Sequence, residues 1–235
     1  IFRVDPQRFL TDDAIPLITP KFYQAGPLQT FTLTSDETGI VVPLTGGGIN
    51  IYDVTTRELR DSFATQWSFH AVLSIAKSDD GILVAVGKDN GEIIVWNLDT
   101  KSKQVVIDAH TLSVTDIEFF PGTQDILSSS LDGSIKRWNA STGENLHTIQ
   151  YNSEVQSLAI TSDGQRFVCG VEEKLEIINA QSYVREWGAS FENRIVEEVT
   201  ISPSNDLLVI GIADLSIHNY EYYQEFMVEV WDMNT

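Results

Sequence analysis

Short runs of apolar and β-branched residues recur along the chain, and clusters of Gly, Asp, Asn, Ser and Pro separate them. The pattern is clearest at residues 126–139, where two strand-like runs, 126–130 and 134–138, flank Leu131-Asp132-Gly133. An Asp-Gly pair between two such runs indicates a β-hairpin. Weaker forms of this hairpin return four more times, so the pattern predicts an all-β chain built from five repeated units.

Each predicted unit begins with a strand that ends in a turn cluster, of which Ser78-Asp79-Asp80-Gly81 is an example. A second strand follows, and then a third that ends in a large apolar residue before Asp or Asn. A fourth, more polar run closes the first four units. The first strands of the five units are expected at 28–34, 72–76, 114–120, 155–161 and 196–202.

The repeat has a measurable period. The apolar residues that end the third strands are separated by 44, 42, 40 and 53 positions; they are Tyr52, Trp96, Trp138, Ile178 and Trp231. A period of about 40 to 45 residues with four strands per unit is typical of a propeller blade. A single sheet of this kind cannot bury both of its faces, so we expect the units to stack face to face and to be held mainly by apolar packing.

The third unit resembles a WD repeat. It has Ala109-His110 in place of the family's Gly-His, the turn Asp132-Gly133, and Trp138-Asn139 in place of Trp-Asp, and the fifth unit has a literal Trp231-Asp232. The resemblance to the WD-repeat β-propeller family extends from Leu28 to the end of the chain. It implies five recognisable four-stranded blades at about 28–65, 70–107, 110–150, 153–188 and 191–235, the last without its outer strand.

The number of blades allows two interpretations. Seven blades of this period need about 300 residues, so we expect the five to belong to a larger, seven-bladed propeller. In the alternative, five blades close and residues 1–4 supply the missing outer strand. Residues 1–27 contain four prolines and are predicted to be an N-terminal arm or linker.

Three residues of the third unit, His110, Ser128 and Asp132, are the residue types of a hydrolase triad. In the family, these positions and Trp138 match a structural tetrad, in which the Asp holds the His and the His bonds the Ser and the Trp. A network satisfied in this way leaves no group free to attack a substrate. The sequence also has no Gly-x-Ser-x-Gly elbow, so we expect a structural role.

Other units depart from this tetrad. The second unit keeps His70 and Trp96 but has Asn90 and Val86 at the Asp and Ser positions, and the fourth has Glu172 and Ile178 at the Asp and Trp positions. In the first unit the Asp position falls on Gly46, within three consecutive glycines. No helix signal or Lys-Ser/Thr follows them, so we expect a loose turn rather than a phosphate site.

The fifth unit carries an insertion of some eleven residues between its second and third strands. It mixes aromatic and acidic side chains, a combination suited to anchoring a basic peptide. We therefore expect a partner-binding site; in the alternative, the insertion only extends the hairpin or covers a blade edge. The candidate residues are Tyr220, Glu221, Tyr222, Tyr223, Glu225 and Phe226.

Charge narrows the choice of partner. The net charge is −19, which disfavours nucleic acid and anionic membranes as direct ligands. From Val171 onward there are 13 acidic and 3 basic residues. We therefore expect a protein or peptide partner, and a basic one if this acidic surface binds it. In the alternative, the acidic surface only aids solubility.

The remaining residues suggest no cofactor or metal. The four histidines are not spaced as metal ligands. The single cysteine, Cys169, is expected to be buried on a strand. A chain with one cysteine is expected in a reducing, intracellular compartment. No apolar run reaches the ~20 residues of a membrane span. We predict a non-catalytic interaction scaffold of a multiprotein complex. The alternatives are a spacer domain, or a propeller hydrolase or isomerase with a metal or acids at the central channel. The best candidates for that enzyme are Glu197 and Glu198, and Asp116 and Glu118 add little.

Overall fold

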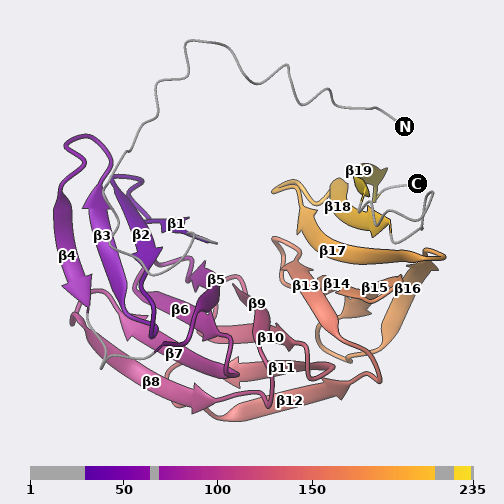
Figure 1. Cartoon of the computed structure of the whole chain (residues 1–235), viewed down its shortest axis with the longest axis horizontal. Coiled ribbons are helices and arrows are strands. Elements are labelled where there is room, and N and C mark those ends of the chain that lie inside the picture. Colours follow the sequence, from indigo (N-terminus) through magenta and orange to yellow (C-terminus); the bar gives the residue numbers. More distant parts are fainter. Residues whose placement is uncertain (1–29, 64–68, 215–224, 234–235) are drawn as a thin grey trace.

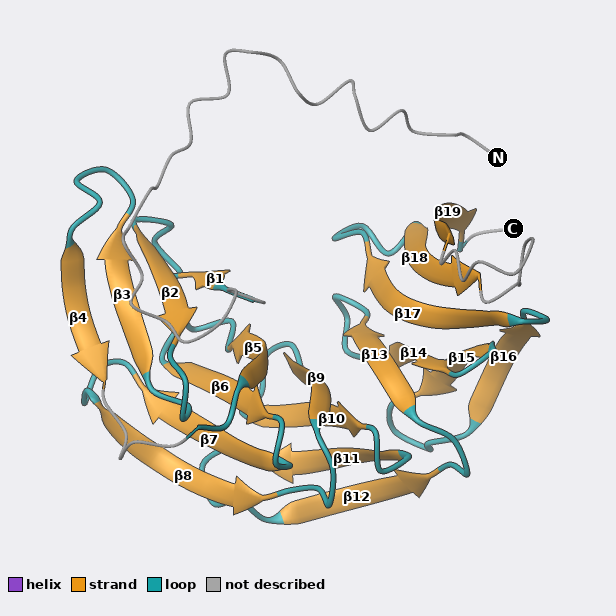
Figure 2. Cartoon of the chain, viewed as in Figure 1, coloured by secondary structure: helices purple, strands orange, loops and turns teal. Residues whose placement is uncertain are grey.

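A computed structural model describes residues 30–63, 69–214 and 225–233. This part of the chain consists of strands joined by turns and contains no helix (Figure 2). Its nineteen strands form five antiparallel sheets, four with four strands and one with three. In each sheet, strands that follow one another in the sequence are neighbours in space. The predicted all-β architecture of repeated antiparallel blades is confirmed.

The bounds of the strands follow the predicted repeat. The first sheet has β1 (Thr32–Leu33), β2 (Gly39–Pro43), β3 (Ile49–Asp53) and β4 (Leu59–Phe63). The second has β5 (Val72–Lys77), β6 (Leu83–Lys88), β7 (Glu92–Asn97) and β8 (Ser102–Asp108). The third has β9 (Val114–Phe119), β10 (Asp125–Ser130), β11 (Ser134–Asn139) and β12 (Asn145–Gln150). The fourth has β13 (Val155–Ile160), β14 (Arg166–Val171), β15 (Lys174–Asn179) and β16 (Arg185–Ser190). The fifth has β17 (Arg194–Ile201), β18 (Leu207–Asp214) and β19 (Glu225–Asp232).

The five sheets, which we call blades one to five, follow one another around an open arc (Figure 1). The first strand of each blade faces the centre of the arc, and the fourth strand of blades one to four lies on its circumference. Blades one and five stand on the two sides of the opening. Strand β1 is shorter than the strand predicted at 28–34. The predicted arm, 1–27, lies outside the described residues.

One hydrophobic cluster fills each junction between consecutive blades. Ile49 and Phe63 of blade one meet Val84 and Trp96 of blade two. A second cluster joins blades two and three, a third joins blades three and four, and a fourth joins blades four and five. A fully buried Leu, Ile or Phe side chain stabilises a fold by about 1.5 to 3 kcal/mol. Each blade therefore supplies part of its neighbour's core, as the repeat predicts.

The fifth blade differs from the others in its second hairpin. Strands β18 and β19 are eight residues long, and their ladder runs from Leu207 opposite Asp232 to Asp214 opposite Glu225. Glu225 and Phe226 were predicted to belong to the inserted loop, but they lie within β19. The insertion thus extends the hairpin in part, because Phe226 pairs with Ala213 at a position that blades one to four do not reach.

Candidate functional site

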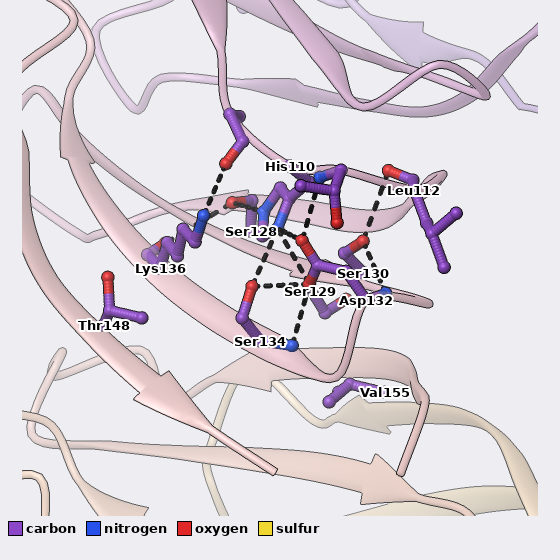
Figure 3. Close-up of polar contacts among 12 residues, drawn as sticks. His110, Leu112, Ser128, Ser129, Ser130, Asp132, Ser134, Lys136, Thr148 and Val155 are labelled. Atoms are coloured by element: carbon purple, nitrogen blue, oxygen red, sulfur yellow. Dashed lines mark hydrogen bonds and ion pairs between the residues drawn. The ribbon is translucent and has the colours of Figure 1, made fainter. Parts of the chain in front are cut away.

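The four residues predicted as a tetrad come together in blade three, and Figure 3 shows three of them, His110, Ser128 and Asp132. Strands β10 and β11 carry Ser128 and Trp138, the turn between them carries Asp132, and the loop before β9 carries His110. His110 Nε2 lies 2.8 Å from Ser128 Oγ, and His110 Nδ1 lies 3.1 Å from Asp132 Oδ2. The indole N–H of Trp138 donates to Ser128 Oγ at 3.0 Å. The hydroxyl of Ser128, rather than the imidazole, is therefore the partner of the Trp in this network.

Ser134 is a further member that the sequence did not reveal. Its hydroxyl donates to Asp132 Oδ1 at 2.6 Å and lies 2.9 Å from His110 Nδ1. Asp132 also accepts hydrogen bonds from the backbone N–H groups of Ser134 and Thr111, at 2.9 and 3.0 Å. The residue that follows Asp132-Gly133 begins β11, and a hydroxyl at that position is the signal that would have found it.

The protonation states follow from these contacts. Burial lowers the pKa of His110 to about 4, more than the neighbouring Asp132 raises it. Although burial opposes it, hydrogen bonds from Ser134 and from the Thr111 N–H lower the pKa of Asp132 to about 2. A neutral imidazole with its proton on Nδ1 then donates to the carboxylate and accepts from the Ser128 hydroxyl. The His110 side chain and Ser128 are fully buried, so neither is open to a substrate.

The second blade does not repeat this arrangement. His70 Nδ1 lies 2.8 Å from Asp89 Oδ1, so Asp89 rather than Asn90 is the acidic partner of this histidine. His70 precedes its inner strand by two residues, whereas His110 precedes β9 by four, and the alignment of the two histidines was wrong. The Trp96 indole N–H donates across the junction to the carbonyl oxygen of Gly47 in blade one, at 2.8 Å.

The three consecutive glycines form a packed turn rather than the loose one predicted. Gly47 has a φ of +89°, and a Cβ at this position would lie 2.6 Å from Ile94 Cδ1 and 3.2 Å from Lys88 Cδ. Lys88 is buried here and pairs with Glu92. The turn of blade one thus lies directly against blade two, because the absence of a side chain at Gly47 lets the side chains of Ile94 and Lys88 pack against its backbone.

The fourth blade fills the tetrad space with other chemistry. Tyr151 precedes β13 by four residues, as His110 precedes β9, and Cys169 stands where Ser128 stands. The Tyr151 hydroxyl donates to Glu176 Oε2 at 3.0 Å, and Arg185 Nη1 lies 3.0 Å from Glu176 Oε1. Burial raises the pKa of Cys169 to about 12, so its thiol is unreactive. At the predicted Asp position, Glu172 accepts from Ser153 Oγ at 2.7 Å.

The face of the arc that carries the tetrad turns is called here the tetrad-side face; it comprises the loops before the inner strands and the turns between second and third strands. The large apolar side chains exposed in its described part include Phe69 at 90% and Leu112 at 52%. They lie on the two sides of the turn that contains Asp89. The Asp89 side chain pairs with His70, which follows Phe69, and the Asp89 carbonyl oxygen accepts from Oγ of Ser113, which follows Leu112, at 2.9 Å.

The predicted aromatic-acidic site is only partly described. Tyr220, Glu221, Tyr222 and Tyr223 lie outside the described residues. Phe226 is 70% exposed on β19, at the tetrad-side end of the strand. The exposed apolar residues Phe69 and Leu112 were missed at the sequence level, because a single apolar residue in a polar loop gives no periodic signal.

The inner strands carry the acids proposed for the enzyme alternative. Asp116 Oδ2 accepts from the Leu158 N–H at 3.0 Å, and Glu118 Oε2 accepts from the Ile160 N–H at 3.1 Å. Burial raises the pKa of Asp116 to about 7 and that of Glu118 to about 8, and the repulsion between neighbouring carboxylates adds to both shifts. These carboxyl groups bind backbone amides of the next blade. In the described part of the chain, no three His, Cys, Asp or Glu side chains are grouped to hold a metal.

The stacked antiparallel blades and the His–Ser–Asp–Trp network define the molecule as a WD-repeat β-propeller. Residues 43–199 match the sequence profile of the nucleolar protein 10-like N-terminal domain. The chain belongs to this family of propeller domains.

Individual proteins resemble the chain over different lengths. The plant protein ROOT INITIATION DEFECTIVE 3 of Arabidopsis thaliana is 28% identical over 220 residues, which are 85% of this chain and 49% of the plant protein. The APC/C activator protein CDC20 of Saccharomyces cerevisiae is 28% identical over 117 residues, 48% of this chain and 19% of the yeast protein. The chain thus spans about half the length of the plant protein and less of the yeast one.

A solved structure supports the fold. A chain of hydrazine synthase from Kuenenia stuttgartiensis superposes with a TM-score of 0.76 at 15% identity, over 93% of this chain and 66% of that one. At this identity the likeness shows the propeller fold alone. Among the described residues, no helix is long and apolar enough to cross a membrane.

Proposed function

We propose that the chain is a non-catalytic interaction scaffold of an intracellular multiprotein complex and binds a protein or peptide on its tetrad-side face. The observation that carries the proposal is the contrast on that face between buried polar groups and exposed apolar ones. His110, Ser128 and Asp132 are engaged with one another, whereas Phe69 and Leu112 project from the two loops beside them. Exposed apolar side chains on a polar rim are typical of interaction surfaces.

The chemistry of the partner follows from charge. The chain carries 34 acidic and 15 basic residues, which favours a protein or peptide with basic groups over nucleic acid. Phe226 and the aromatic residues of the insertion, Tyr220, Tyr222 and Tyr223, extend the proposed surface in blade five. A relative named as an activator of the APC/C, itself a protein complex, supports the assignment to an assembly.

The test is affinity capture from native extract with the natural polypeptide and two matched pairs of substitutions. Phe69→Ala with Leu112→Ala removes apolar surface from the tetrad-side face. Leu59→Ala with Val184→Ala removes residues that are 53% and 60% exposed at the opposite end of the blades. We expect the first pair to lose a specific partner and the second pair to retain it. Equal capture by both pairs would contradict the proposal.

The inserted aromatic residues are tested separately. Replacing Tyr220, Tyr222, Tyr223 and Phe226 by Ala is expected to weaken capture of the same partner. If every partner stays bound, the insertion is not part of the surface. A spacer domain would show no partner that depends on either set of residues.

The enzyme alternative has weaker support. Two of its candidate acids, Asp116 and Glu118, each accept a hydrogen bond from a backbone amide of blade four. In the same cluster, Glu198 Oε1 lies 3.4 Å from Ser157 Oγ. Carboxyl groups tied to the scaffold in this way are poorly placed to bind a substrate. Tight binding of a divalent metal by the purified protein, lost in Glu198→Gln, would favour the enzyme.

A further inference from the structure

A groove lies between β16, the fourth strand of blade four, and β19, the third strand of blade five. Its volume is about 520 Å³, within the ~300–1,000 Å³ that is typical of ligand sites. It lies at the end of the strands opposite the tetrad-side face, because Arg166, which begins β14, is part of its lining. The other lining residues that matter here are Ile177, Glu186, Trp187, Trp231 and Asp232.

Two tryptophan side chains form a corner of this groove. The ring centroids of Trp187 on β16 and Trp231 on β19 are 5.5 Å apart, and the two ring planes meet at 79°. Trp187 is 43% exposed. The Trp231 indole N–H donates to Glu229 Oε2 at 2.8 Å, so a carboxylate lies beside this ring. Two indoles at a steep angle beside a carboxylate are suited to binding a cation, because the faces of aromatic rings attract positive charge.

The preceding junction shows what the corresponding place in the fold can hold. In blade three, Arg137 on the third strand pairs with His147 on the fourth, and in blade four Ile177 pairs with Trp187 in the same way. The Arg137 guanidinium carbon lies 4.1 Å from the centroid of the Phe120 ring. A guanidinium of the chain itself therefore lies on an aromatic ring between blades three and four.

This guanidinium contacts both of the blades that it joins. Arg137 Nη2 lies 2.7 Å from Asp125 Oδ2 in its own blade, and Arg137 Nη1 lies 3.4 Å from the Tyr183 hydroxyl oxygen in blade four. In blade four, the positions of the arginine and the aspartate are held by Ile177 and Arg166. Ile177 carries no charge and lines the groove, so the place that Arg137 fills in one junction is open in the next.

The charges around the groove favour a cation as its ligand. A basic residue of the lining, Arg166, has its Nε 2.8 Å from Glu186 Oε2, so these two charges balance each other. Asp232 also lines the groove, and Glu229 lies beside Trp231. These two carboxylates give the groove an excess of negative charge, which attracts a cation and repels an anion.

We propose that this groove binds the side chain of an arginine from a protein or peptide partner, with the guanidinium seated against Trp187 and Trp231. The carboxylates of Asp232 and Glu229 complement its charge. Arginine is preferred to lysine because a planar guanidinium stacks on an aromatic ring, as Arg137 does in blade three. The groove is thus a docking point for a basic partner that is separate from the tetrad-side face.

Two tripeptides test the proposal on the natural polypeptide, isotope-labelled at its tryptophan indoles for NMR. Acetyl-Gly-Arg-Gly-amide offers a guanidinium, and acetyl-Gly-citrulline-Gly-amide is its uncharged isostere. We expect the arginine peptide to shift the indole N–H signals of Trp187 and Trp231, and the citrulline peptide to bind at least about fivefold more weakly. Equal binding of the two peptides would overturn the proposal. An absence of shifts with both would overturn it as well, because the groove would then be closed to a ligand.

A substitution of one indole tests whether the groove is the site. Trp187→Leu removes one ring and is expected to weaken binding of the arginine peptide about fivefold or more. Val184→Ala is the matched control, because Val184 is 60% exposed just before β16, and it should leave binding unchanged. A thermal unfolding curve checks that both variants are folded. Equal binding by the two variants would overturn the proposal.

A second substitution supplies the guanidinium from the chain itself. Ile177→Arg places an arginine where blade three has Arg137, and it is expected to abolish binding of the arginine peptide by occupying the groove. Ile177→Gln, which is polar but uncharged, is the control and should retain more of the binding. If the folded Ile177→Arg variant binds the peptide as well as the wild type does, the guanidinium site is not in this groove.

Discussion

The Tyr151 hydroxyl lies 3.8 Å from Cys169 Sγ, at the positions that His110 and Ser128 occupy in the preceding blade. The same space between two blades is thus closed by two different networks. In blade three, the neutral His110 imidazole is hydrogen-bonded to the ionised Asp132 and to the Ser128 hydroxyl, and the Trp138 indole N–H donates to that hydroxyl. In blade four, a phenol reaches past a thiol to Glu176, a buried carboxylate that Arg185 binds from the solvent side.

Tyr151→Phe tests the blade-four network. The substitution keeps the ring but removes the hydroxyl that donates to Glu176, a residue that is only 8% exposed. We expect the free energy of unfolding to fall by about 1 to 2 kcal/mol in urea titrations, because a buried carboxylate loses a donor. Tyr183→Phe is the control, since its hydroxyl lies 3.4 Å from Arg137 Nη1 and contributes less. An equal loss in both variants would contradict this account.

Ser128→Ala tests the blade-three network. The substitution leaves the Trp138 N–H without its acceptor and His110 Nε2 without its donor, and both are buried. We expect a loss of about 2 to 3 kcal/mol in the free energy of unfolding. In a double-mutant cycle, Trp138→Phe is expected to cost less in the Ser128→Ala background than in the wild type. Additive losses would show that the serine and the indole act independently.

Gly47→Ala tests the close approach between blades one and two. An added methyl group would lie 2.6 Å from Ile94 Cδ1 at a φ of +89°, so both packing and backbone are strained. We expect a loss of about 2 to 4 kcal/mol, measured by thermal or urea unfolding. Gly122→Ala is the matched control, because Gly122 has a φ of +68° but a methyl group added there would meet no atom within 4 Å. It should show the backbone cost alone, about 1 kcal/mol.

Asp116→Asn tests the pH dependence of the inner strands. The pKa of Asp116 is raised in the folded chain to about 7, so the folded state holds a proton that the unfolded state releases above about pH 4. Its contribution to stability is therefore full below pH 4 and is lost as the pH rises toward 7. Between pH 5 and 8 we expect the free energy of unfolding to fall less in the variant than in the wild type. The difference between the two falls is expected to be on the order of 1 to 3 kcal/mol.

The comparison isolates this carboxyl group from others. The Asp116→Asn variant keeps an oxygen for the Leu158 N–H, so the junction itself is retained. His110, with its lowered pKa, acts in the opposite direction below pH 6.5 and is common to both proteins. The raised pKa of Glu118 depends in part on repulsion from Asp116, so the difference between the two pH profiles reports Asp116 together with its coupling to Glu118. Parallel profiles would contradict its raised pKa.

The sequence predicted the repeat well because blade structure depends on local patterns. Alternating apolar residues, the Asp132-Gly133 turn and the spacing of Trp96 and Trp138 specify strands, turns and blade order. The contacts between blades were harder to predict. The Gly47 carbonyl oxygen receives its hydrogen bond from Trp96, 49 residues away, and no local pattern reveals such a contact. The alignment of His70 with His110 was wrong for the same reason, because the path of the loop, which no local pattern reveals, brings His70 to Asp89.

The candidate site divides in the same way. Ser128 and Asp132 lie on one hairpin, so their approach could be read from the sequence, and a family resemblance supplied His110 and Trp138. Tyr151 and Cys169 escaped notice because their residue types match no motif, although their positions repeat those of the tetrad. Phe69 and Leu112 are candidates because their side chains are exposed, and the sequence pattern that predicts strand pairing does not predict the exposure of a loop residue.

The amide-to-side-chain bonds between inner strands also bear on how such a chain can grow. At each of these junctions the donor is a backbone group that every residue except proline possesses, and the acceptor is one side chain, an aspartate in blade three and a serine in blade four. A duplicated or transplanted blade therefore meets its neighbour through one such residue as well as through the apolar cluster that fills the junction. The polar part of the junction depends on a single side chain, so its residue type can change from blade to blade while the backbone donor stays the same.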